Sequence, residues 1–88
     1  MPVAVEISMY PLDGDYVGHI RAFIDRLHAH AGLRIHTNQL STQIWGEYRL
    51  VMGILTDEMA MAAGGAPQLV FVMKLLPGLA APPLPPPA

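Results

Sequence analysis

Apolar side chains repeat with two different periods along this chain, and the order of those periods limits the folds it can adopt. Residues 3–10 alternate apolar and polar side chains, which indicates a strand with one buried face. Residues 16–31 place apolar side chains every three or four positions, as an amphipathic helix does. Asp13 or Asp15 is expected to cap the start of this helix, and Gly32 is expected to close its end.

The second half of the chain repeats this succession with one more strand. Residues 33–38 and 41–45 alternate again, and Gly46 ends the second of these strands. Residues 48–59 carry another helical stripe, and residues 68–75 form a dense apolar run, which predicts a strand covered on both faces or nearly so. The order βαββαβ predicts an α+β fold: a ferredoxin-like sandwich with a four-stranded antiparallel sheet, order 4-1-3-2, and two helices on one face.

The composition changes near residue 77. Residues 1–76 are expected to form one ligand-binding domain, because a chain of 88 residues rarely holds two. Residues 77–88 form a proline-rich tail that is expected to be disordered or extended, since proline disfavours both helix and sheet ladder. An alternative interpretation is that the tail is a ligand for a proline-binding groove, which would give the chain an adaptor role.

Charge and composition exclude several classes of function. The net charge is −2 and the five Lys and Arg residues are scattered, so no basic patch is expected to bind nucleic acid. There is no cysteine, which removes disulfides and thiolate metal sites. The four histidines have no metal-binding spacing, so no metal site is expected. No apolar run is long enough to cross a membrane and no secretion signal is visible, so the expected location is the cytoplasm.

Residues 37–48 (TNQLSTQIWGEY) form the most polar segment of an otherwise apolar chain. They place seven hydrogen-bonding side chains and two aromatic ones within twelve residues. Grouped on a hairpin, these side chains suit recognition of a small polar ligand. No activated nucleophile or phosphate-binding loop accompanies them, which argues against catalysis.

This segment, together with residues 5–12 (VEISMYPL), resembles the YkoF-like family of thiamine and hydroxymethylpyrimidine binders. The resemblance extends over residues 3–75. It implies a ferredoxin-like fold, a single-domain member that associates into a homo-oligomer, and binding of thiamine or its pyrimidine precursor without an enzymatic step. It implies no cofactor other than this ligand.

The chemistry of an aminopyrimidine is compatible with the residue types present. Carboxylate or amide oxygens accept from its exocyclic amine, hydroxyls serve as donor or acceptor, and aromatic rings stack on it. Strand alternation directs Thr37 and Thr42 toward the helices and Ser8 and Gln43 toward the open sheet face, and it places Glu47 at the opposite end of the sheet. The residues expected to bind the ligand are Ser8, Tyr10, Thr37, Asn38, Thr42, Gln43 and Glu47.

Each of these residues also has a structural interpretation. Thr37 and Thr42 could bond each other across the hairpin, and Glu47 could interact with the helix dipole. Ser8 and Gln43 could belong to a subunit interface. The open sheet face, with Trp45, Val70 and Val72, and the apolar edge of the fourth strand are expected to pair with another copy in a dimer or tetramer.

The alternative function is a regulatory module that senses a small molecule, or a ferredoxin-like enzyme. His36 or Glu6 would serve as the base in that enzyme.

Overall fold

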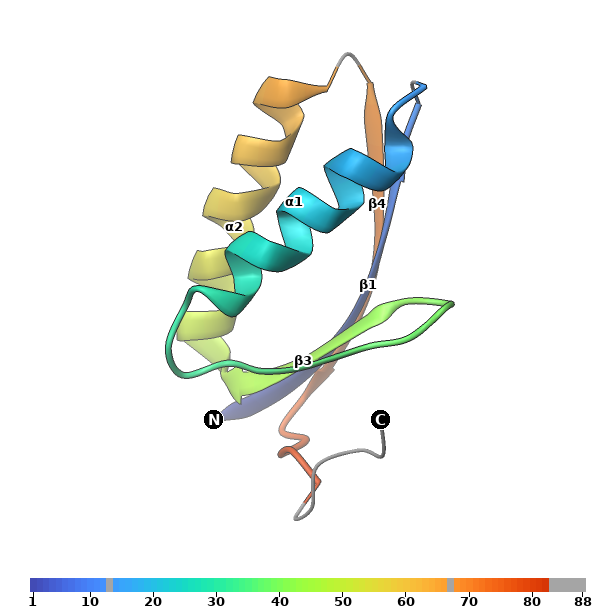
Figure 1. Cartoon of the computed structure of the whole chain (residues 1–88). Coiled ribbons are helices and arrows are strands. Elements are labelled where there is room, and N and C mark those ends of the chain that lie inside the picture. Colours follow the sequence, from blue (N-terminus) through green and yellow to red (C-terminus); the bar gives the residue numbers. More distant parts are fainter. Residues whose placement is uncertain (13, 67, 83–88) are drawn as a thin grey trace.

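The computed structural model describes residues 1–12, 14–66 and 68–82, and its elements follow the predicted order. Two helices and four strands alternate as βαββαβ (Figure 1). Asp15 occupies the N-cap position of the first helix, one of the two alternatives predicted, while Asp13 lies outside the described residues. The elements are β1 (Pro2–Pro11), α1 (Tyr16–His28), β2 (Arg34–Thr37), β3 (Thr42–Glu47), α2 (Tyr48–Gly65) and β4 (Leu69–Pro77).

The four strands form one antiparallel sheet in the order β2-β3-β1-β4, and this confirms the predicted topology. Both helices cover the same face of the sheet (Figure 1). β1 pairs with β4 from Val3 to Pro11 but with β3 only from Pro2 to Ile7. Within the described residues, the edge of β1 beyond Ile7 therefore has no strand beside it on the β3 side.

The core lies between the sheet and the two helices. Val3, Val5 and Ile7 of β1 are buried, so the alternation predicted for this strand is confirmed. Phe23 is buried beneath α1, and its ring centroid lies 5.1 Å from that of Phe71. The other buried members of this cluster are Met9, Leu27, Ile44, Val51, Ile54, Leu55 and Ala62.

A charged cluster joins the end of α1 to α2. Arg26 Nε donates to Glu58 Oε1 at 2.8 Å, and His30 Nε2 lies 2.7 Å from Glu58 Oε2. The hydrogen bond from His30, supported by Arg26, lowers the pKa of the Glu58 carboxyl below its usual range. The ionised carboxylate thus holds the two helices together at one point of their contact.

Several predicted element ends are wrong. α1 ends at His28, not at residue 31, because the backbone N–H groups of Ala29 and His30 bond the carbonyls of Arg26 and Leu27 in a tight final turn. Gly32 therefore does not close the helix; its φ of +87° serves the loop before β2. β3 does not end at residue 46 either, since it runs to Glu47 and passes directly into α2.

β4 was expected to be covered on both faces or nearly so, but within one chain only one of its faces is covered. Leu69, Phe71 and Met73 pack against the core, whereas Val70 and Val72 are exposed on the open face. The reason is that both helices lie on one face of the sheet, so a continuous apolar strand still has one uncovered side. Residues 78–82 of the tail form no helix or strand, and residues 83–88 lie outside the described residues.

Two glycines give opposite expectations for substitution by alanine. A Cβ on Gly46 would lie 2.8 Å from Val51 Cγ2 and 3.0 Å from the Gly32 carbonyl oxygen, and Val51 is fully buried and cannot move aside. Gly46→Ala is therefore expected to lower the free energy of unfolding by about 1–2 kcal/mol.

Gly53 lies in α2 with open space around it, so Gly53→Ala is expected to raise the free energy of unfolding by about 0.5–1 kcal/mol. Urea unfolding of the two variants measures both values, and equal stabilities would contradict the packing assigned to Gly46.

Candidate ligand-binding site

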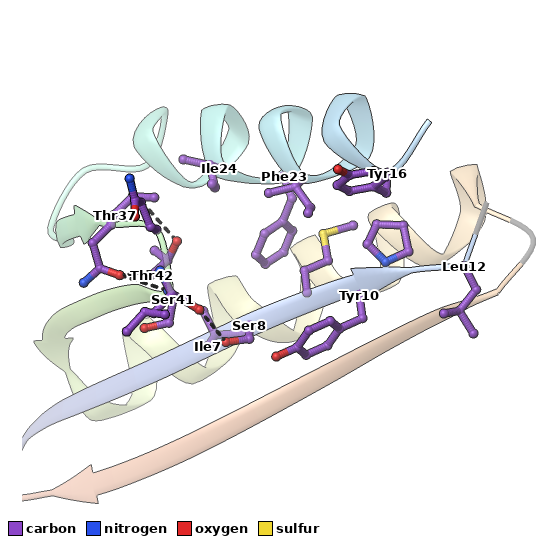
Figure 2. A pocket seen from close by; sticks show the side chains of 16 residues that line it. Ile7, Ser8, Tyr10, Leu12, Tyr16, Phe23, Ile24, Thr37, Ser41 and Thr42 are labelled. Carbon is purple, nitrogen blue, oxygen red and sulfur yellow. Dashed lines mark hydrogen bonds between the residues drawn. The ribbon is translucent and has the colours of Figure 1, made fainter. Parts of the chain in front are cut away.

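A cavity of about 410 Å³ opens beside the unpaired edge of β1. In Figure 2, Tyr16, Phe23 and Ile24 of α1 lie on one side of it, Ser8 and Tyr10 of β1 on the other, and the hairpin between β2 and β3 closes one end. Its lining is Ile7, Ser8, Met9, Tyr10, Pro11, Leu12, Tyr16, Ile20, Phe23, Ile24, Thr37, Asn38, Gln39, Leu40, Ser41 and Thr42.

The cavity arises from the unequal lengths of the strands. The last pair between β1 and β3 joins Ile7 to Thr42, the first residue of β3. β1 continues beyond this pair, whereas the residues before Thr42 form the turn that comes from β2. Side chains of both parities on β1, among them Met9 and Tyr10, therefore border the same space. The backbone at this edge also brings polar N–H and C=O groups to the cavity.

Two threonine hydroxyls mark the hairpin end of the cavity. Thr37 and Thr42 are cross-strand partners, and their Oγ1 atoms lie 3.1 Å apart. Thr42 is only 5% exposed, so its hydroxyl is largely withdrawn from water. The structural interpretation, that these residues bond each other, is therefore correct. A hydroxyl has one hydrogen and two lone pairs, so the pair retains hydrogen-bonding capacity toward a ligand.

The hairpin tip is held by its own hydrogen bonds. Asn38 Oδ1 accepts from the backbone N–H groups of Leu40, at 2.8 Å, and Ser41, at 3.0 Å. Ser8 Oγ donates to the Leu40 carbonyl at 3.4 Å, which links the tip to β1. These bonds assign the Asn38 oxygen to the turn.

Five of the seven predicted site residues border this cavity: Ser8, Tyr10, Thr37, Asn38 and Thr42. Strand alternation alone assigned Ser8 to the open face, but the missing neighbour of β1 gives this residue access to the cavity from the strand edge. The sequence argument did not identify Ile20, Ile24, Gln39 and Leu40. The helical stripe of α1 was a usable signal for the first two, since one side of that stripe faces the cavity.

The other two predicted residues, Gln43 and Glu47, lie elsewhere. Gln43 borders a separate cavity that also includes Glu6 and Trp45 of the open face. Glu47 is the N-cap residue of α2, at the opposite end of β3, and its Oε2 accepts from the Leu50 N–H at 2.8 Å. This bond, with a second from the Arg49 N–H, lowers the pKa of the Glu47 carboxyl. The position of Glu47 therefore agrees with its structural interpretation, a carboxylate at the start of a helix.

The proposed bases of the alternative function lie outside the first cavity. Glu6 accepts from Ser41 Oγ at 3.1 Å and lies 3.6 Å from Lys74 Nζ. His36 pairs in register with Gln43 on β3. Neither residue is in the lining of the cavity at the edge of β1, so an enzyme that used them would need a different site.

Metal-binding side chains are dispersed in residues 1–12, 14–66 and 68–82. No group of three or more His, Asp or Glu residues there lies close enough to hold an ion. Neither of the two described helices is long and apolar enough to cross a membrane.

No protein-family model and no curated protein matches this sequence. Solved structures with the same fold do match. A protein from Streptococcus pneumoniae has a TM-score of 0.83 at 20% identity, with 90% of this chain and 89% of that chain covered. A Thermotoga maritima protein named "putative thiamine biosynthesis/salvage protein" has a TM-score of 0.76 at 18% identity, covering 85% and 82%. A domain of unknown function from Bacillus cereus has a TM-score of 0.75 at 15% identity, covering 94% and 84%. At these identities the likeness establishes the fold.

Proposed function

We propose that this chain binds thiamine or its hydroxymethylpyrimidine precursor without transforming it. The observation that carries the proposal is the cavity at the edge of β1. Its volume of about 410 Å³ lies within the range of about 300–1,000 Å³ that small-molecule pockets occupy. It combines an apolar wall with hydroxyls at one end, which is the combination that a flat ring with polar substituents requires.

Under this proposal, each part of the ligand has a suitable partner in the lining. Thr37 and Thr42 offer hydroxyls to the ring nitrogen and the exocyclic amine, and Phe23 offers an apolar surface to the ring. The exposed rings of Tyr10 and Tyr16, at the mouth, offer π faces to the thiazolium cation of thiamine. The name of the Thermotoga maritima protein, which shares the fold, points to the same chemistry.

The charge of the lining supports binding without catalysis. Every described residue that lines the cavity is uncharged. A hydrolase or isomerase would require an acid or base within hydrogen-bond reach of the ligand. Glu6 and His36, the bases considered in the alternative, lie outside this lining.

Isothermal titration calorimetry with thiamine and with hydroxymethylpyrimidine tests the proposal. Thr42→Val keeps the shape of the side chain and removes its hydroxyl, so it is expected to weaken binding about tenfold, or ~1.4 kcal/mol. Thr56→Val is the matched control, because the Thr56 hydroxyl bonds the Met52 carbonyl on α2, away from the cavity. Absence of heat with both compounds and folded protein would reject the proposed ligands, and equal losses in the two variants would reject the role of Thr42.

We further propose that copies of the chain associate through the β4 edge and the adjacent part of the open face. Tyr10, Val70 and Val72 are each about half exposed there, although β4 is long and apolar. An edge strand of this kind favours pairing with its own copy across a two-fold axis.

A further inference from the structure

Trp45 lies on the open face of the sheet and is nevertheless buried. It pairs in register with Ala4 on β1, and the two side chains are only 8% and 7% exposed. Both helices lie on the other face, so they do not cover these residues. Tyr10 and Val72, farther along the same face, remain exposed. Something other than the helices therefore shields one end of this face.

Residues 78–82 are held at this end of the face. Gly78, with φ of +90°, turns the chain after β4, and its N–H donates to the Pro2 carbonyl of β1 at 2.7 Å. Figure 1 shows this segment leaving β4 at the end of the sheet where the N-terminus lies. Leu79 borders a cavity of about 340 Å³ with Ala4 and Trp45.

The far end of the segment is fixed to β2, the opposite edge strand. Arg34 Nη1 donates to the Pro82 carbonyl, and Arg34 pairs in register with Trp45. The anchors at Pro2, Trp45 and Arg34 thus lie on β1, β3 and β2 in turn, so the segment crosses three strands. Residues 78–82 form no helix or strand themselves.

We propose that residues 78–82 act as a strap that covers the Trp45 end of the open face and keeps a second copy of the chain from docking there. Without the strap, Trp45 and Ala4 would lie exposed beside Leu76, the register partner of Ala4 on β4. The polar row Gln43, Glu6 and Lys74 separates this apolar patch from the rest of the open face. This patch adjoins the β4 edge, so a second copy is its expected occupant, and the inference rests on the association proposed above. The strap is held by few contacts, and Leu79 is still 50% exposed. Single substitutions are therefore expected to release it.

The fluorescence of Trp45 provides a direct test, because it is the single tryptophan of the chain. Leu79→Asp, in the full chain, places a carboxylate against the apolar side chains of Trp45 and Ala4 and is expected to release the strap. In dilute protein the emission maximum should shift to longer wavelength and quenching by acrylamide should increase. On concentration, sedimentation velocity should show a larger species than the unchanged chain forms.

A second variant and a control separate release of the strap from general effects. Arg34→Gln removes the guanidinium that bonds Pro82 and should change fluorescence and sedimentation in the same direction. Met61→Asp introduces the same charge on an exposed apolar residue of α2 and should change neither. Circular dichroism establishes that each variant is folded. Unchanged Trp45 emission and quenching in folded Leu79→Asp and Arg34→Gln, or increased exposure without a larger species, would overturn the proposal.

Discussion

Phe23→Ala is expected to lower the free energy of unfolding by about 3–5 kcal/mol, the largest effect of any single change considered. Phe23 is 2% exposed, and its ring packs against Phe71 between α1 and the sheet. Removal of the ring leaves a void continuous with the cavity beside β1, because Phe23 is also part of the cavity lining. A domain of this size has a total stability of the order of 5–15 kcal/mol, so the variant should be close to unfolding.

Chemical denaturation followed by circular dichroism measures this effect. Tyr16→Ala is the matched control: it removes an aromatic ring from the same helix, but from a side chain that is more than half exposed. It should cost no more than about 1 kcal/mol. Similar losses of unfolding free energy in the two variants would show that burial of the Phe23 ring adds little stability.

Glu58→Ala is expected to lower the free energy of unfolding by about 2–3 kcal/mol, because two charge-assisted hydrogen bonds between the helices are lost together. The loss is smaller than for a fully buried pair, since the side chains of Arg26 and His30 remain about one-third exposed. Asp57→Ala, at the neighbouring exposed position of α2, is the control and should change stability little.

The contribution of Glu58 should also depend on pH. The pKa of this carboxyl is lower in the folded chain than the ordinary value of a glutamate side chain, 4.5. The stabilisation is therefore fully present above pH 4.5 and is lost as the pH falls through the folded pKa. The difference in stability between the unchanged chain and Glu58→Ala should be largest near neutral pH and should shrink in acid. Urea unfolding across this range measures it, and a constant difference would contradict the ionic role of Glu58.

The topology was predictable from the sequence because each element buries one face, and that burial is visible in the spacing of apolar residues. The ends of elements were less predictable. Gly32 looked like the end of α1, but hydrogen bonds of Ala29 and His30 end the helix earlier, and the glycine serves the following loop. The carboxylate of Glu47 is a group that could accept a hydrogen bond from a ligand, but its position at the junction of β3 and α2 makes it a helix cap.

The candidate site was only partly predictable for a related reason. Alternation tells which face of a strand a residue occupies, but it does not tell where the neighbouring strand stops. Ser8 and Tyr10 reach the cavity because pairing with β3 ends at Ile7. The burial of Trp45 depends on residues 78–82, which are distant in sequence and have no periodicity to indicate where they lie.

Under the proposed function, the unequal pairing of β1 links ligand binding to the stability of the sheet. Beyond Ile7 this strand is held by β4 on one side alone, so local opening there should require less free energy than in the doubly paired half. A ligand lying along that edge would cover the part of β1 that β3 leaves unpaired. Because it would bind the folded chain and not the unfolded one, it would stabilise the sheet at its weakest segment. Amide hydrogen exchange at residues 8–10 would then report occupancy of the cavity directly.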